Sequence, residues 1–103
     1  MMFTFFTATS GNKSIKQTPV TENHVWLICD KVATDWRDLG TVLGTTSALM
    51  DIIEADCSAS HEKARKVLLK WKQRKGKRAT VGILINALKE IERIDVVEKL
   101  LGM

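Results

Sequence analysis

The sequence predicts an all-α domain, and three observations support this class. Beyond about residue 20, apolar residues recur at spacings of three and four, the period of a helix with one buried face. No stretch alternates apolar and polar residues for long enough to make a strand. The chain's one proline, Pro19, precedes the helical pattern and interrupts none of it. With 103 residues, 45% of them apolar, the chain has room for one domain.

Residues 1–20 are expected to be a flexible lead-in to a folded domain over residues 21–103. Thr7 to Val20 is rich in Ser, Thr, Gly, Asn and Lys. Met1 to Thr7 is apolar but lacks the basic flank and the cleavage pattern of a secretory signal. Its three phenylalanines either pack on the domain or stay disordered. No run approaches the about 20 apolar residues of a membrane span, so we expect no membrane insertion.

The first helix is predicted over about residues 21–32, with Thr21 as its N-cap. Its buried stripe follows the i, i+3, i+4, i+7 spacing: Val25, Ile28, Cys29 and Val32. The second helix is predicted over about residues 36–43, with Asp35 as N-cap, Asp38 as an N3 carboxylate and Gly44 as its stop. Its inward face is expected to consist of Trp36, Leu39 and Leu43.

The third helix, about residues 47–56, is expected to turn Leu49, Ile52 and Ile53 inward and two carboxylates outward. The fourth, about residues 61–75, has the clearest pattern, with Ser60 as N-cap and Gly76 as its end. Its predicted stripe is Ala64, Val67, Leu68 and Trp71.

The fifth helix is predicted over about residues 81–90, with Thr80 as its N-cap. Its apolar stripe is Val81, Leu84, Ile85 and Leu88. The sixth is predicted over about residues 95–101, with Val97 and Leu101 directed inward and Ile94 entering just before it.

Several short motifs help to choose among helical folds. Each motif alone is weak, but their order and spacing together are specific. They are Ile28-Cys29-Asp30-Lys31-Val32, Asp35-Trp36-Arg37 with Leu39, Trp71-Lys72, Ala79-Thr80-Val81 and Ala87-Leu88. Together they resemble the death-domain family, and in particular its Fas-associated adaptor group. The stretch Ile91 to Val97 is more similar to the ankyrin group of the family.

The resemblance implies a six-helix antiparallel Greek-key bundle. It further implies a non-catalytic module that assembles with other death domains in apoptotic or innate-immune and inflammatory signalling, and it does not name the partner. In this family a basic surface on the first and fourth helices commonly meets an acidic surface on the second and third helices of the next molecule.

Charge is distributed unevenly along the chain. Between His61 and Arg78 there are nine Lys or Arg residues and one Glu, while the whole chain has a formal net charge of +4. The remainder is therefore net negative. We name as the basic surface six residues of the fourth helix: Lys63, Arg65, Lys66, Lys70, Lys72 and Arg74. We name as the acidic surface four carboxylates of the second and third helices: Asp35, Asp38, Asp51 and Glu54.

Two different complementary surfaces on one molecule make a head-to-tail contact, which generates rings or open helical stacks. The sequence therefore predicts homotypic partners, with self-assembly into helical oligomers as one form. Each charge run also has a simpler interpretation as a solvated helix face, because exposed ion pairs contribute under about 1 kcal/mol. Trp26 lies off the buried stripe and either packs under the lead-in or anchors an interface.

A basic nucleic-acid-binding helical domain is the alternative function, since the sequence pI is about 9.3 and Lys72 to Arg78 could contact phosphates. It is disfavoured because this run has no interleaved aromatic residues for base stacking. Enzymatic activity is not expected, because His24 and His61 have no catalytic spacing with the cysteines. No cofactor or metal site is expected. Cys29 and Cys57 are predicted to be reduced, buried thiols, which favours the cytoplasm.

Overall fold

The computed structural model describes residues 17–102 of the chain. Within this part there are six α-helices, two short 3₁₀-helices and no β-strand beyond one isolated bridge. The elements are α2 (Glu22–Cys29), η2 (Ala33–Asp35), α3 (Trp36–Val42), α4 (Ser47–Asp56), α5 (Ser60–Lys75), η3 (Gly76–Arg78), α6 (Val81–Glu90) and α7 (Ile94–Leu101). The expected lead-in over residues 1–20 lies outside the described residues except for its last four.

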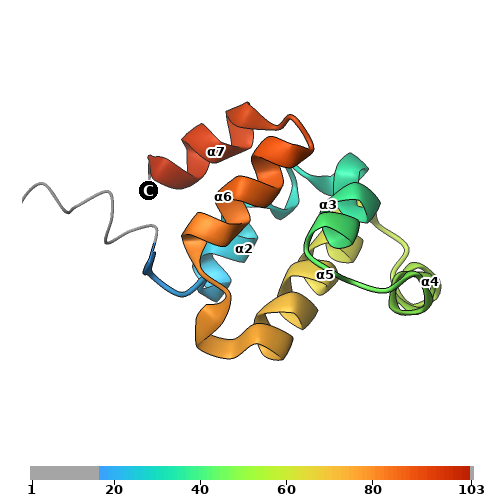
Figure 1. Ribbon diagram of the computed structural model, residues 1–103. Coiled ribbons are helices and arrows are strands. Elements are labelled where there is room, and N and C mark those ends of the chain that lie inside the picture. The colour runs from blue at the N-terminus through green and yellow to red at the C-terminus, as the bar shows by residue number, and fades with distance from the viewer. Residues whose placement is uncertain (1–16, 103) are drawn as a thin grey trace, which may run out of the picture.

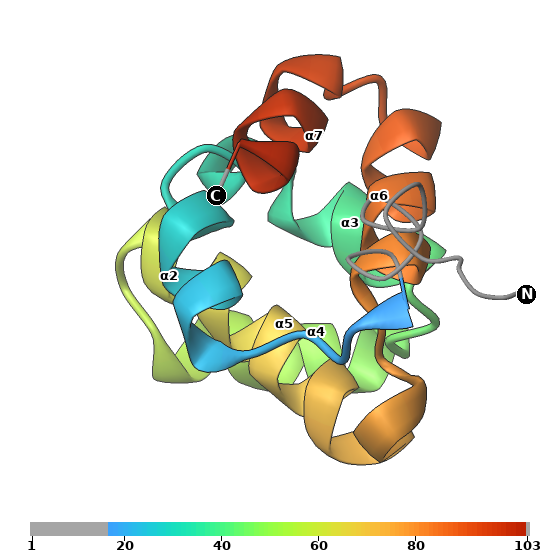
Figure 2. The same cartoon turned by 90° about the vertical axis from the view of Figure 1, so that its left-hand side faces the viewer.

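Helix α5 lies at the centre of the bundle, and α2, α3, α4 and η2 all pack on it. Helix α6 packs on α3 and α7, and α7 returns to α2 (Figures 1 and 2). Helix α4 lies at one end of the molecule and contacts only its two neighbours α3 and α5 closely (Figure 1). The all-α prediction is therefore confirmed for the described residues.

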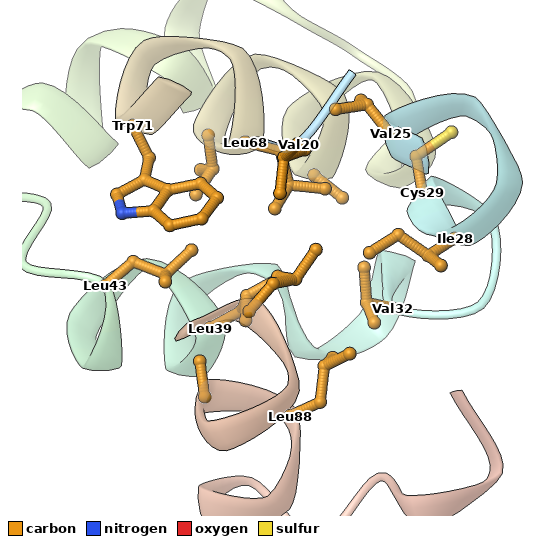
Figure 3. Close-up of a cluster of buried hydrophobic side chains, with 14 of the residues drawn as sticks. Val20, Val25, Ile28, Cys29, Val32, Leu39, Leu43, Leu68, Trp71 and Leu88 are labelled. Atoms are coloured by element: carbon orange, nitrogen blue, oxygen red, sulfur yellow. The ribbon is translucent and has the colours of Figure 1, made fainter. Parts of the chain in front are cut away.

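One continuous core joins these helices, and most of its members were predicted from the helical stripes. Trp71 and Leu68 from α5 face Leu39 of α3, Leu88 of α6 and Ile28 of α2 (Figure 3). All five residues are at most 1% exposed. Burial of side chains this large contributes about 1.5–3 kcal/mol each to folding. Trp36 is also buried, so two of the three tryptophans are core residues as predicted.

Threonine hydroxyl groups cap the N-termini of three of the helices. Thr21 accepts a hydrogen bond from the backbone N–H of His24, and Thr80 accepts one from Ile83, which confirms both predicted N-caps. Thr46 does the same for α4 through the N–H of Leu49. These bonds satisfy donors that the first turn of a helix leaves unpaired.

Two other predicted caps are wrong. Asp35 makes no capping bond because η2 runs directly into α3, and its carboxylate instead accepts a hydrogen bond from Arg93. Ser60 is the first residue of α5, and the preceding Ala59 has no side chain that could cap the helix. The predicted ends at Gly44 and Gly76 are confirmed, since both adopt positive φ angles that glycine tolerates.

Two helix faces and one helix end differ from the prediction. Ile52 of α4 is 57% exposed, and Met50 takes its place in the core beside Ile53. At the C-terminus, Leu101 is 40% exposed and Val96 and Leu100 are buried with Val97. Ile94 is exposed as the first residue of α7. The third difference is at α2, which ends at Cys29 instead of continuing to about residue 32, although Val32 remains buried.

The segment just before α2 is part of the packed body. Val20, which the sequence assigns to the lead-in, is 1% exposed, and its N–H donates to the carbonyl of Ala79 at 2.7 Å. The N–H of Val81 donates to the carbonyl of Thr18 at 2.9 Å. These two bonds hold the start of the described chain against the turn between α5 and α6.

The cap of α2 should make stability depend on pH through His24. The Nδ1 atom of its neutral ring accepts a hydrogen bond from the N–H of Thr21 at 2.9 Å, and partial burial lowers the pKa of His24 from 6.5. The unfolded chain therefore binds the proton more readily. We expect the free energy of unfolding to fall as pH drops below about 6.5.

The matched variant for this prediction is His24→Gln, because Gln at this position keeps the reciprocal capping bonds and does not titrate. Urea unfolding followed by circular dichroism, repeated between about pH 7 and pH 5, should give a smaller pH dependence for the variant. Equal dependence in the two proteins would exclude His24 as the source.

Candidate protein-interaction surfaces

The basic surface occupies two edges of α5. Lys63 lies over the Trp36 ring of α3, with its Nζ 5.8 Å from the ring centroid. Arg65 lies on the other side, with its guanidinium carbon 4.9 Å from the Trp26 ring of α2. Lys66 is exposed and has no ion pair within the described chain. One edge therefore faces α3 and the other faces α2.

Trp26 is the most exposed tryptophan, at 58%, and does not join the core cluster. Its ring stacks on Arg65, and the two side chains border a small hollow of about 50 Å³ with Leu69. An exposed aromatic ring held by a cation is a rigid contact surface, of the kind enriched at protein interfaces.

Arg74 differs from the other members of the basic surface. Its Nη2 donates a hydrogen bond at 2.9 Å to the carbonyl of Leu43, the residue that closes α3. This bond satisfies one of the carbonyls that the end of a helix leaves unpaired. Arg74 therefore contributes to the α3–α5 packing, while Lys66, Lys70 and Lys72 have no side-chain partner within the described residues.

The acidic surface contains a cation that the sequence reading overlooked. Arg37 of α3 forms ion pairs with Asp51, at 3.3 Å, and with Glu54, both on α4. These hydrogen bonds, chiefly that of Glu54, raise the pKa of Arg37. Two of the four predicted carboxylates, Asp51 and Glu54, are therefore already bound to one arginine. Asp38 is exposed and has no ion pair in the described part of the chain.

Arg93 is the second cation that sequence reasoning missed. Its Nη1 contacts Asp35 at 2.5 Å, and its Nε and Nη2 donate to Asp95, each at 3.1 Å. Hydrogen bonds to Asp95 and Asp35 hold the pKa of Arg93 above its usual range and lower the pKa of Asp95. The contact ties α7 to the turn before α3. Asp35 is therefore a structural ion-pair partner at the margin of the acidic surface.

Other site chemistries receive little support from the part of the chain that the structure describes. No group of three or more His, Cys, Asp or Glu residues there is arranged to hold a metal ion. Cys29 is buried and Cys57 is half-buried, and neither forms a disulfide. No helix between residues 17 and 102 is both long and apolar enough to cross a bilayer.

Comparison with known families decides the classification. The family model described as Death domain matches residues 22–103, which is most of the chain. The chain belongs to the death-domain family. This confirms the predicted death fold, and it agrees with the six α-helices found between residues 17 and 102.

Curated relatives of this death domain are signalling proteins. Human receptor-interacting serine/threonine-protein kinase 1 is 34% identical over 87 residues, which cover 82% of this chain and 13% of that protein. Mouse tumor necrosis factor receptor superfamily member 10B is 31% identical over 65 residues, 63% of this chain and 17% of that protein. Mouse FAS-associated death domain protein is 38% identical over 64 residues, 61% of this chain and 31% of that protein.

The chain spans less than a third of the length of each of these relatives. What the match establishes is the death domain itself, a homotypic protein-interaction module in apoptosis and inflammation signalling.

Removing Arg93 tests the ion pair that holds α7. We expect Arg93→Ala to lower the free energy of unfolding by about 1 kcal/mol, since the contact with Asp35 is only partly shielded from water. The matched control is Lys77→Ala, which removes an exposed cation without an ion pair among the described residues. Chemical denaturation of both variants measures the difference, and an equal effect would contradict a structural role for Arg93.

Proposed function

We propose that this death domain assembles head to tail with other death domains, including copies of itself, through its basic and acidic surfaces. The observation that carries the proposal is the position of Lys66 on α5 and Asp38 on α3. Both are exposed, of opposite charge and without an ion pair within the described residues. Such charges chiefly orient and accelerate encounter, and affinity comes from a few desolvated contacts.

Trp26, stacked on Arg65 of the basic surface, supplies a candidate desolvated contact. On the opposite surface, Arg37 fixes Asp51 and Glu54 in one arrangement before any partner arrives. Side chains that are already ordered lose less entropy on binding. The internal ion pairs therefore reduce the net charge of the acidic surface and also preorganise it.

The cellular role that we propose is a non-catalytic adaptor or receptor-tail module in the cytoplasm. The names of its relatives include a receptor, a receptor-interacting kinase and a FAS-associated protein, which supports a place in receptor signalling. Two free thiols support a reducing compartment. The kinase among the relatives is matched over only 13% of its length, and nothing in the family match carries catalysis to this chain.

Charge reversal tests the two surfaces. Lys66→Glu and Asp38→Lys should each raise the concentration needed for assembly at least about tenfold, because each places like charges across the contact. These positions are preferable to Asp51, whose replacement would also break the pair with Arg37. Light scattering over a range of concentrations, at low and high salt, measures the mass, and circular dichroism monitors helicity.

Lys99→Glu and Glu98→Lys, at two exposed positions of α7, serve as matched controls. They make the same changes in net charge outside the two surfaces. Mixing Lys66→Glu with Asp38→Lys should recover assembly, because both contacts of an alternating stack join opposite charges: one contact is the native pair and the other is the reversed pair. These surfaces are not the interface if both single variants assemble like the wild type. They are also excluded if the wild-type protein assembles and its mass does not change with salt.

A further inference from the structure

A groove of about 400 Å³ lies where the ends of α3 and α5 meet α6. It contains no member of the basic or acidic surface. Its floor is apolar and built from the core, with Leu43 and Trp71 largely buried. Val42 and Ile83 stand at its lip, 42% and 46% exposed. Grooves of this size with apolar walls and a few polar groups are the usual form of a ligand site.

Trp71 presents an unused hydrogen-bond donor to this groove. The residue is 1% exposed, yet its indole N–H has no hydrogen-bond partner among the described residues. Among residues 17–102, only the hydroxyl of Thr45 is a side-chain polar atom both sealed from solvent and without a hydrogen-bond partner, so the unpaired nitrogen of Trp71 is not fully sealed. Figure 3 shows the nitrogen at the edge of the ring near Leu43, away from Leu68. Buried indoles normally find an acceptor, so an occupant with an oxygen acceptor fits here.

Opposite charges mark the two ends of the groove. Lys75 and Arg78 lie at the turn between α5 and α6, and Glu90 is the last residue of α6. From Ile83 to Glu90 the helix rises about 10 Å, at 1.5 Å per residue. Extended peptide advances about 3.3 Å per residue, so this length corresponds to about three peptide steps.

Asn86 lies between these ends on the exposed side of α6 and lines the groove. A side-chain amide offers both a donor and an acceptor, which match the N–H and C=O of an extended backbone. An amphiphile with one carboxylate, such as a fatty acid, would pair with Lys75 and Arg78 only. Its apolar tail would then lie beside the charged Glu90. The combination of an apolar floor, a central amide and opposite terminal charges therefore favours a peptide over a lipid.

We propose that this groove binds a short extended segment of a partner protein, with a carboxylate at one end, two large apolar residues in the middle and a cation at the other. The carboxylate lies against Lys75, Arg78 and the indole N–H of Trp71. The apolar residues cover Val42 and Ile83, and the cation pairs with Glu90. This site shares no residue with the basic surface on α5 or the acidic surface on α3 and α4, and Lys66→Glu leaves peptide binding unchanged.

The test begins with a displayed library of random peptides, selected on the full chain and counter-selected on Ile83→Asn. The expected peptides share an acidic residue next to two large apolar residues. In nuclear magnetic resonance titrations, the most enriched peptide should shift the indole N–H signal of Trp71 and leave that of Trp26 unmoved. Arg78→Glu and Ile83→Asn should each weaken its affinity at least about tenfold.

Matched controls come from equivalent residues outside the groove. Ile52→Asn replaces another exposed isoleucine, on α4, and Lys77→Glu reverses the charge of the residue next to Arg78. Both should keep the affinity within about twofold of wild type. Peptides that bind the controls and the groove variants equally well, or that share no acidic and apolar pattern, would overturn the proposal.

Two other occupants would be recognised in the same experiments. If the Trp71 signal moves with the concentration of the chain alone, the groove binds a second copy and the proposal is wrong. If sodium dodecanoate moves this signal and no selected peptide does, the site takes a free amphiphile, and the proposal is equally wrong.

Discussion

The fold depends on one narrow apolar stripe along α5. Only four of its sixteen residues are buried: Ala64, Val67, Leu68 and Trp71. Four neighbouring elements pack on this helix, so the direction of the stripe determines where each of them lies. The remaining positions of α5 hold seven of the chain's sixteen Lys and Arg residues, whose charges stay at the surface because an unpaired buried charge is costly. The same constraint that builds the core therefore assigns the basic residues to the two edges of α5.

Local sequence signals predicted those parts of the fold that are determined within a single element. The bounds of α6 are those expected, because Thr80 and a complete apolar stripe lie in one continuous stretch. The choice between Met50 and Ile52 was not accessible in this way. Both are apolar, and only the positions of α3 and α5 beneath α4 show which one reaches the core. At the C-terminal end, the sequence likewise could not show that Leu100 and not Leu101 is buried, because both are leucines and only the packing of α7 distinguishes them.

The charged groups show this limit more clearly, because their partners are distant in sequence. Asp35 has the residue type and position of an N-cap, yet it binds Arg93, which is 58 positions further along. Arg74 was grouped with free cations, and it bonds a carbonyl 31 positions earlier. Spacing along one helix predicted which face each charge occupies. The packing of other helices determined whether that charge was free for a partner or already bound.

Trp71 belongs both to the core and to the lining of the groove. The proposed groove contact therefore differs in kind from the proposed contact between charged surfaces. The buried ring of Trp71 packs between α5 and α3, and the same residue lines the groove, which contains no member of the basic surface. Contacts between exposed charges weaken as salt shortens the screening length, which is about 10 Å at 0.1 M. Burial of apolar side chains in a groove is not screened in this way. Raising the salt should therefore weaken the proposed head-to-tail contact and leave the apolar part of the proposed groove contact intact, so that a domain released from its neighbours would still hold a peptide.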